Sequence, residues 1–322
     1  MVLFMEQITL AIVIPCYNEE ECIDKTTERL LEILSDLRNK NEISDNSFIF
    51  CVDDGSKDKT WEIIKKYNKE TNGKVKGISF SRNFGNQKAI LAGLFEAEKY
   101  GADCYITIDA DLQQDENKIS EFLQKFRDGA QIVCGVKKDR NVDGFFKKNT
   151  ALTFYRLMNL IGVNIKINHS DYRLVSKRIV DVLKTYPETN LFLRGIFNEL
   201  GFKQAYVYFD VKERFAGTTK YTKCSLVRLA LDGITSFSIA PLRFVTFIGF
   251  LMATLSFLGG IETIIAKYFG EYMVPGWATI MVATGFIGGI QIFCIGVIGE
   301  YVGQLFQEVK ARPRYIIEDE TK

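Results

Sequence analysis

Apolar and polar residues are arranged in alternating blocks along residues 8–135. Short runs rich in β-branched and aromatic residues are separated by longer segments with helical spacing. This arrangement is typical of a parallel sheet with helices on its faces. The runs predicted to be strands are 8–14, 48–52, 75–80, 105–108 and 131–134. The chain is therefore predicted to begin with an α/β domain.

Polar segments directly follow most of these predicted strands. Ligand sites in open α/β sheets form at the carboxyl ends of the strands. The segments at those ends are Pro15-Cys16-Tyr17-Asn18-Glu19-Glu20, Asp53-Asp54-Gly55-Ser56, Ser81-Arg82-Asn83-Phe84-Gly85 and Asp109-Ala110-Asp111. Their convergence predicts a single polar site along one edge of the sheet.

The sharpest chemical signature is the apolar run 105–108, which ends in two carboxylates one residue apart. Side chains alternate along a strand, so Asp109 and Asp111 point the same way if strand geometry persists to its end. Mg²⁺ and Mn²⁺ prefer oxygen ligands and leave positions open for substrate phosphates. Gln113 could add a carbonyl oxygen. The pattern predicts a binding site for a metal-bound diphosphate. The alternative is that the two acids are ordinary solvent-exposed residues at the end of a strand.

Other phosphate-binding signatures are missing from the sequence. It contains neither G-x-G-x-x-G nor G-x-x-x-x-G-K-[ST]. The glycine-rich loops that bind phosphates in dinucleotide-binding and P-loop proteins are therefore not indicated. Phosphates would have to be held by a metal on the paired acids and by scattered arginine and lysine residues.

The C-terminal third is far more apolar than the rest. Residues 244–266 are apolar except for Thr, Ser and Glu262, and Gln291 is the strongly polar residue of 277–299. A helix of roughly 20 residues crosses a hydrocarbon layer of about 30 Å. These runs predict a transmembrane hairpin, with two buried helices of a soluble core as the alternative. Basic residues on both outer flanks, Arg243, Lys310, Arg312 and Arg314, place those flanks in the cytosol.

Two segments before the hairpin, 145–158 and 226–231, interleave apolar and basic residues. They are predicted to be either interfacial helices or ordinary amphipathic packing helices.

Composition excludes several other classes. Lys and Arg total 41 against 40 for Asp and Glu, so no global charge attracts nucleic acid. The seven cysteines lack C-x-x-C spacing, which argues against a disulfide framework or a structural zinc site. His169 is the one histidine, which excludes multi-histidine metal sites. Residues 1–6 lack the basic start and apolar run of a signal peptide, so the body is expected to fold in the cytosol.

The segments at the strand ends, together with Asp171-Tyr172-Arg173-Leu174 and the segment 214–221, resemble glycosyltransferase family 2. The resemblance is strongest to the polyprenyl-phosphate glycosyltransferases, which include dolichyl-phosphate mannose synthases and bactoprenol glucosyltransferases. It covers nearly the whole chain. It implies an α/β fold of the GT-A type, with a Rossmann-like, mostly parallel sheet, followed by interfacial helices and a two-helix transmembrane hairpin.

The resemblance also implies roles for individual positions. The residues expected to line the nucleotide or support its turn are Pro15, Tyr17, Glu19, Asp53 and Asp54. The residues expected to hold the metal and the diphosphate are Asp109, Asp111 and Gln113. The residues expected to face the diphosphate or the acceptor phosphate are Arg140, Arg214 and Lys220. Asp171 and Arg173 match a motif beside the sugar, and Arg82 and Lys137 complete the predicted substrate-binding set. Lys137 stands where related chains often carry arginine, which argues against a bidentate phosphate clamp there.

The implied reaction is attack by a polyprenyl-phosphate oxygen on the anomeric carbon of a nucleotide-activated hexose, with inversion and release of a nucleoside diphosphate. Mg²⁺ or Mn²⁺ would stabilise the leaving group. The acceptor phosphate is already ionised near neutral pH, so no strong general base is required. Asp171 is expected to orient the acceptor, the sugar or Arg173, with proton abstraction as a second choice. Arg214 is expected to offset the repulsion between the two anions.

Several alternatives stay open. UDP-glucose is favoured as donor, with a GDP-mannose-dependent enzyme of the dolichyl-phosphate mannose synthase type as the runner-up. A noncatalytic membrane protein that binds lipid phosphates or nucleotide-sugars is a third reading. A polysaccharide synthase is disfavoured because two spans offer little wall for a polymer channel, and because the segment 192–195 lacks the Q-x-x-R-W signature.

The predicted organisation is a cytosolic catalytic domain at 1–222, a juxtamembrane helix at 223–243, a hairpin at 244–301 and a cytosolic tail at 302–322. Both termini are expected in the cytosol. The glycine-rich spans predict self-association into a homo-oligomer.

Overall fold

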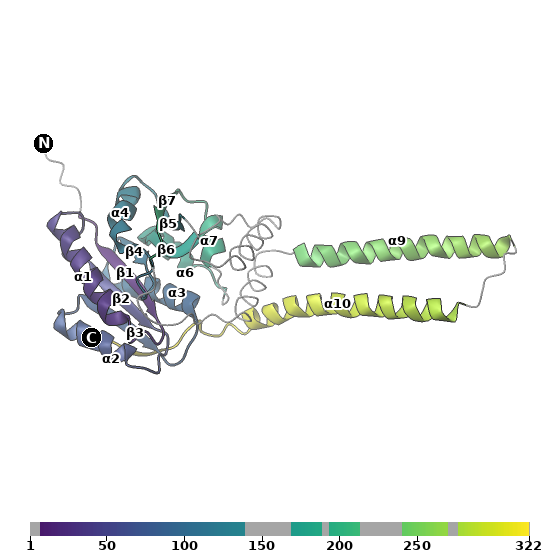
Figure 1. The fold of residues 1–322 in the computed structure, drawn as a ribbon, viewed down its shortest axis with the longest axis horizontal. Coiled ribbons are helices and arrows are strands. Elements are labelled where there is room, and N and C mark those ends of the chain that lie inside the picture. Colours follow the sequence, from purple (N-terminus) through teal and green to yellow (C-terminus); the bar gives the residue numbers. More distant parts are fainter. Residues whose placement is uncertain (1–6, 139–168, 189–192, 213–239, 270–275, 322) are drawn as a thin grey trace. The chain divides into compact units, whose positions relative to one another are not determined.

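The computed structural model describes residues 7–138, 169–188, 193–212, 240–269 and 276–321 (Figure 1). The chain divides into two compact units. The first contains residues 1–160, 164–222 and 313–322, and the second contains 161–163 and 223–312. The first unit carries the sheet and the second carries the two long helices.

An eight-stranded sheet forms the centre of the described part of the first unit, with the strand order β7-β5-β6-β4-β1-β2-β3-β8. The strands are β1 (Leu10–Cys16), β2 (Phe48–Asp53), β3 (Val75–Phe80), β4 (Cys104–Thr107), β5 (Ile132–Lys137), β6 (His169–Ser176), β7 (Gln204–Phe209) and β8 (Ile317–Glu320). The pairs β1–β2, β1–β4, β2–β3 and β5–β7 are parallel. β6 runs antiparallel between β4 and β5, and β8 runs antiparallel along β3. The mostly parallel sheet predicted from the sequence is confirmed.

Helices cover both faces of this sheet (Figure 1). They are α1 (Ile23–Asn39), α2 (Thr60–Glu70), α3 (Asn86–Ala97), α4 (Ile119–Arg127), α6 (Lys177–Lys184) and α7 (Leu193–Glu199), with the short 3₁₀ turns η1 (Glu98–Tyr100) and η2 (Glu116–Lys118). β1 is apolar and buried on both faces, as expected for a central strand of a parallel sheet. Its side chains Leu10, Ile12 and Ile14 belong to a core cluster with residues of α1, α2 and α4.

Helix α3 covers the other face of the central strands. It approaches so closely that a Cβ atom added to Gly93 would lie 2.3 Å from Val13 Cγ1 and 2.9 Å from Val52 Cγ2. A side chain at this position would therefore push α3 away from β1 and β2. The glycine sets the distance between this helix and the strands whose ends carry the polar segments.

The second unit contains α9 (Ala240–Tyr268) and α10 (Trp277–Val309). At 1.5 Å per residue these helices are about 44 and 50 Å long, more than the roughly 30 Å of a hydrocarbon core. Windows at Leu242–Gly259 and Ala283–Val309 have mean hydropathies of 1.7 and 1.6, and their side chains are almost entirely exposed. Both helices are thus long and apolar enough to cross a membrane, and their exposure is not that of core helices in a soluble domain.

The segment 302–322, predicted as a cytosolic tail, contains regular structure. Helix α10 continues to Val309, and residues 317–320 form the edge strand β8. The side chain of Trp61 donates to Asp319 (Nε1 to Oδ2, 2.9 Å), and the Gly77 N–H donates to Thr321 Oγ1 (2.9 Å). The C-terminal residues therefore complete the sheet of the first unit. A short polar strand of this kind gives no period-two signal that a sequence could reveal.

Some predictions concern residues outside the described ranges. These are the phosphate-facing residues Arg140, Arg214 and Lys220, and the amphipathic segments 145–158 and 226–231.

Candidate active site

The loop after β1 is tied to the loop after β2. The Asn18 N–H donates to Ser56 Oγ (2.8 Å), and the Lys57 N–H donates to Asn18 Oδ1 (2.8 Å). Asn18 has a φ of 52°, a conformation that asparagine tolerates better than most residues. The predicted nucleotide residues Tyr17 and Glu19 flank this asparagine, so these hydrogen bonds fix the backbone that carries them. Pro15 lies within β1, opposite Val52 of β2.

Asp53 is a fully satisfied acid at the end of β2. It is 1% exposed, and its Oδ1 accepts the Ser56 N–H at 3.2 Å while its Oδ2 accepts the Ser79 hydroxyl at 2.7 Å. The hydrogen bonds link the β2 turn to β3. The support that the resemblance implied for Asp53 at the nucleotide turn stays a prediction.

Asp54 holds the loop that follows β3. Its Oδ1 accepts the Phe84 N–H at 2.6 Å, and its Oδ2 accepts the Gly85 N–H at 2.9 Å. Burial raises the pKa of this carboxyl to about 6, although the two N–H groups act in the opposite direction. Gly55 has a φ of 66°, and a Cβ there would lie 2.4 Å from the Arg82 carbonyl carbon. The hydrogen bonds of Asp54 and the absence of a side chain at Gly55 therefore allow the loops after β2 and β3 to pack closely.

Arg82 is exposed at the surface of this loop. Its guanidinium lies 4.0 Å from the centre of the Phe84 ring, and its Nη1 donates to the Asn83 carbonyl at 3.2 Å. The arginine is thus held at the rim of the same edge as Asp54, where a charged ligand can reach it.

The paired acids lie in a turn, which corrects the premise that strand geometry persists through them. β4 ends at Thr107, and residues 108–112 are not part of a strand. Leu112 has a φ of 52°, and the Gln113 N–H donates to Asp111 Oδ1 at 3.1 Å. The chain leaves the sheet here because local hydrogen bonds to side chains take the place of the hydrogen bonds between strands.

Asp109 is held by Gln114 and crowded by other acids. The Gln114 amide donates through Nε2 to Asp109 Oδ2 (2.6 Å), and the Asp109 N–H donates to Gln114 Oε1 (3.0 Å). Burial and the negative charges of Asp171 and Asp111 raise the pKa of Asp109 to about 7, while Lys137 acts in the opposite direction. Three carboxylates and two positive side chains, Lys137 and Arg194, therefore interact at this end of the sheet.

Asp171 is the acid whose negative charge contributes most to the raised pKa of Asp109. Asp171 lies on β6, and its carbonyl oxygen accepts the hydroxyl of Thr107 at the end of β4. Its carboxylate accepts two hydrogen bonds from Arg194 of α7, Nε to Oδ1 at 2.9 Å and Nη2 to Oδ2 at 2.8 Å.

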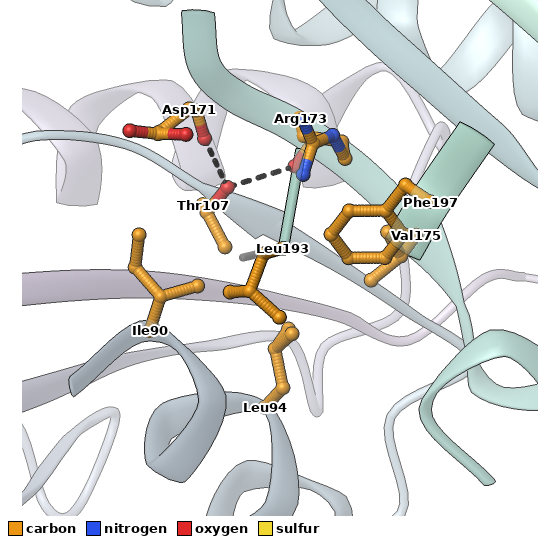
Figure 2. Close-up of a pocket in the computed structure, with 8 residues that line it drawn as sticks. All are labelled: Ile90, Leu94, Thr107, Asp171, Arg173, Val175, Leu193 and Phe197. Atoms are coloured by element: carbon orange, nitrogen blue, oxygen red, sulfur yellow. Dashed lines mark hydrogen bonds between the residues drawn. The ribbon is translucent and has the colours of Figure 1, made fainter. Parts of the chain in front are cut away.

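A small pocket lies beside Asp171 (Figure 2). Its walls come from α3, β4, β6 and α7, and its lining is mainly apolar. The lining residues are Ile90, Leu94, Thr107, Asp171, Arg173, Val175, Leu193 and Phe197. Arg173 is only 3% exposed, and its guanidinium lies 4.1 Å from the centre of the Phe197 ring. Its role beside the sugar stays a prediction.

The turn that carries Gln113 is held in place by contacts with the chain after β7 and with α1. The Lys212 N–H donates to the Gln113 carbonyl at 3.0 Å, and Lys212 Nζ lies 2.6 Å from Glu116 Oε2. Glu116 is almost buried and also pairs with Arg29 of α1 (3.3 Å). The acid-bearing turn is therefore attached both to α1 and to the chain after β7.

Sequence reasoning missed two residues of this site, Gln114 and Arg194. Gln114 follows the predicted metal motif directly, but nothing in its spacing indicates that its amide folds back on Asp109. Arg194 contacts an acid 23 residues earlier in the chain, and only the packing of α7 against β6 brings them together.

The donor set suits a hard divalent cation in part. Asp109, which is half-buried, and Asp111, which is buried, supply carboxylate oxygens, and the negative charge of Asp171 near them favours an added positive charge. Within the described ranges, no three histidine, cysteine or acidic side chains form a ready metal cluster. A cation here would take two protein carboxylates and complete its coordination from substrate phosphate and water.

Comparison with known proteins identifies the family. Residues 11–183 match the family model Glycosyl transferase family 2, and residues 240–305 match the GtrB C-terminal hairpin. The chain therefore belongs to glycosyltransferase family 2. The matched hairpin confirms the resemblance to the polyprenyl-phosphate branch.

Individual relatives cover nearly the full length. The chain is 49% identical over 312 residues to the "Uncharacterized glycosyltransferase YkoT" of Bacillus subtilis (strain 168), which covers 97% of this chain and 92% of that protein. It is 39% identical over 312 residues to the "SfII prophage-derived bactoprenol glucosyl transferase" of Shigella flexneri, covering 96% and 97%. It is also 39% identical to the "Prophage bactoprenol glucosyl transferase homolog" of Escherichia coli (strain K12), covering 96% and 98%.

Proposed function

We propose that this chain transfers a hexose, with glucose favoured, from a nucleotide-sugar, with a UDP-sugar favoured, to a membrane polyprenyl phosphate. The products are a polyprenyl-phosphate sugar and a nucleoside diphosphate. The observation that carries the proposal is the gathering of Asp109, Asp111 and Asp171 at the carboxyl end of the sheet. The full-length similarity to a bactoprenol glucosyl transferase supports the choice of sugar and acceptor.

Asp109 and Asp111 are proposed to hold a divalent cation, Mg²⁺ or Mn²⁺, with Gln113 as an additional oxygen donor. Such a cation neutralises the charge that develops on the departing diphosphate, an effect worth several kcal/mol. Gln114 fixes one Asp109 oxygen at 2.6 Å, which leaves the carboxylate preorganised. Lys137 adds a positive charge near the same acid.

The donor nucleotide is proposed to lie against Pro15, Tyr17, Glu19 and the loop held by Asp54. In this proposal Asp53 and Asp54 act by holding the chain around the nucleotide, because their oxygens accept hydrogen bonds from the loops after β2 and β3 and from the Ser79 hydroxyl. Arg82 stands at the exposed rim, where it can approach a phosphate. The remaining predicted phosphate contacts are Arg140, Arg214 and Lys220.

The acceptor side is proposed to involve Asp171 and Arg173. Asp171 forms a two-point ion pair with Arg194. An acceptor phosphate carries its own negative charge and needs no base to remove a proton, so an orienting role for Asp171 is favoured over proton abstraction.

The hairpin explains why a catalytic domain of this type needs an anchor. A polyprenyl phosphate stays in the bilayer, and confinement of enzyme and acceptor to one surface raises their effective concentration. We propose that α9 and α10 span the membrane, that the catalytic domain faces the cytosol, and that both termini are cytosolic. Basic residues at the outer flanks favour this orientation. The glycine-rich spans favour a homo-oligomer.

The test is a donor panel. Purified full-length protein is offered UDP-glucose, other UDP-sugars and GDP-mannose with polyprenyl phosphate and Mg²⁺ or Mn²⁺, and the lipid products are identified by mass spectrometry. Polyprenyl-phosphate glucose is the expected product. A mannosyl product from GDP-mannose would support the runner-up donor, and long polymer would support a synthase. Binding of donor without any lipid product would support the noncatalytic alternative.

A further inference from the structure

The strand pairing brings Asp171 to the catalytic end of the sheet. Thr107 of β4 is paired with Arg173 of the antiparallel strand β6. Asp109 comes two residues after Thr107, just beyond the end of β4, and Asp171 comes two residues before Arg173 within β6, so both acids lie at the same end of the β4–β6 pair. The charges of Asp171 and Asp111 both act on Asp109, so three acidic side chains interact at this end of the sheet. Their mutual repulsion requires compensation to keep one geometry.

Arg194 supplies that compensation for Asp171. Its guanidinium meets the carboxylate as a fork, with Nε 2.9 Å from Oδ1 and Nη2 2.8 Å from Oδ2. Two parallel hydrogen bonds fix the rotation of a carboxylate as well as its distance, which a single contact with lysine cannot do. The side chains are only 13% and 28% exposed, so solvent screens the pair weakly.

The helix that carries Arg194 is itself fixed at both ends. At its start, the Leu193 N–H donates to Gln87 Oε1 of α3 at 3.3 Å. Near its end, the Phe197 carbonyl accepts the Gln204 amide at 2.8 Å. The side chains of Leu193 and Phe197 are buried in the wall of the pocket beside Asp171 (Figure 2). These contacts anchor helix α7 to the rest of the first unit and so hold Arg194 beside Asp171.

We propose that Arg194 is a positioning residue of the transfer reaction, which acts by fixing the orientation of the Asp171 carboxylate near Asp109. The inference rests on the proposed function. The proposal adds helix α7 to the active site, to which the sequence analysis had not assigned it. Because a small displacement of a reacting or orienting group reduces turnover strongly, the effect is expected in kcat rather than in donor binding.

The experiment is a double-mutant cycle on the full-length protein with UDP-glucose and polyprenyl phosphate. The variants are Arg194→Ala, Asp171→Ala and the combination of both, with Arg178→Ala as the matched control. Arg178 is an exposed arginine whose guanidinium lies over the Phe202 ring at 5.0 Å. The control is expected to keep wild-type kinetics.

The Arg194→Ala variant is expected to lose about 100-fold in kcat, with the KM for the donor within about threefold. The double variant is expected to be no slower than Asp171→Ala, because the arginine acts through that acid. Millimolar guanidinium is expected to restore part of the kcat of Arg194→Ala, a rescue that lost packing would not allow. Multiplicative losses in the double variant, or an unchanged kcat in Arg194→Ala, would overturn the inference.

Arg194→Lys keeps the positive charge without the fork, so it tests the geometry even if the alanine variant folds poorly. Its kcat is expected to fall about tenfold, and a value within twofold of wild type would overturn the role of the fork. A wild-type chain that transfers no sugar to any polyprenyl phosphate would refute the proposed function. An active wild type with unchanged Arg194 variants would refute only the positioning role.

Discussion

Two pairs of acids stand at strand ends in this protein, and their surroundings differ. Asp53 ends β2 and Asp54 follows it, and all four of their carboxylate oxygens accept hydrogen bonds, three from backbone N–H groups of neighbouring loops and one from the Ser79 hydroxyl of β3. Asp109 and Asp111 follow β4, and the charges of Asp111 and Asp171 raise the pKa of Asp109. The first pair is saturated by the protein, whereas the second is crowded by like charge.

The difference indicates which pair holds the fold and which is prepared for a ligand. Hydrogen bonds from backbone N–H groups satisfy a buried carboxylate and cost nothing further when a substrate arrives. Crowded carboxylates are unfavourable until a cation joins them, so part of the binding energy of a metal comes from relief of repulsion. Two adjacent acids can therefore have a structural or a ligand-binding role, and only the groups that surround them in the fold show which.

The largest expected effect is at the crowded pair. Asp111→Ala is predicted to reduce transfer by about 1,000-fold or more, because leaving-group stabilisation is lost. Membrane insertion should be unchanged, which fractionation of membranes would verify. The matched control is Asp103→Ala. This exposed acid accepts the Thr9 N–H at 2.8 Å beside the start of β4, at the opposite edge of the sheet. Substantial activity in Asp111→Ala would break the comparison.

A smaller effect is expected at the saturated pair. In Asp54→Asn the side chain can accept only through its one oxygen, so the N–H of Phe84 or Gly85 loses its partner. The loop after β3 should loosen, and the KM for the donor is predicted to rise about tenfold while kcat stays within threefold. Steady-state kinetics with a varied nucleotide-sugar measure the split. A fall in kcat alone would mean that Asp54 acts in the chemical step.

The pH dependence of stability sharpens the same comparison. In chelator, the folded state binds a proton at Asp109 up to a pKa of about 7, whereas the unfolded chain releases it near pH 4. The contribution of this group to stability is therefore lost as pH rises from about 4 to 7. Asp109→Asn is predicted to melt a few degrees higher than wild type at pH 8, with the gap closing toward pH 5.

Calorimetry or fluorescence-detected melting across this pH range tests that prediction. Excess Mg²⁺ should raise the melting temperature of wild type at pH 8 and leave that of Asp109→Asn nearly unchanged. An equal gap between the two proteins at pH 5 and pH 8 would contradict the raised pKa.

The smallest effect is expected from Ser79→Ala, which removes one hydrogen bond to Asp53. The Ser79 hydroxyl donates to Asp53 Oδ2 at 2.7 Å, in a buried position. The free energy of unfolding is predicted to fall by about 1–2 kcal/mol, with transfer rates within twofold of wild type. Urea unfolding measures the stability change. A large loss of activity at unchanged stability would show that Asp53 touches the substrate.

Much of the catalytic fold could be predicted because central parallel strands are buried on both faces and read as apolar runs. The strand predicted at 75–80 has the observed bounds of β3, and the others begin or end within three residues of the predictions. β6 was not predicted as a strand, because residues 169–176 are mixed in polarity and pair antiparallel between two other strands. β8 is short and polar, and only its pairing with β3 defines it.

From the residue pattern alone, site positions were predictable where they directly follow an apolar strand, whereas Asp171 and Arg173, within β6, were predicted from the resemblance. Asp54 and Asp109 were found because each stands just after an apolar run. Their roles differ through contacts such as those of Phe84 and Gln114, which depend on how the chain turns after the strand. Arg194 was not found, since the contact that matters is formed by packing between distant segments.

The central claim is that Asp109 and Asp111 hold a divalent cation together with the donor diphosphate. Its most direct test is a Mn²⁺ titration of the full-length protein followed by electron paramagnetic resonance, with and without UDP, in wild type and in Asp111→Ala. The account predicts that UDP tightens Mn²⁺ binding to wild type and that Asp111→Ala weakens it by at least about tenfold. Equal Mn²⁺ affinity in the two proteins would contradict the account.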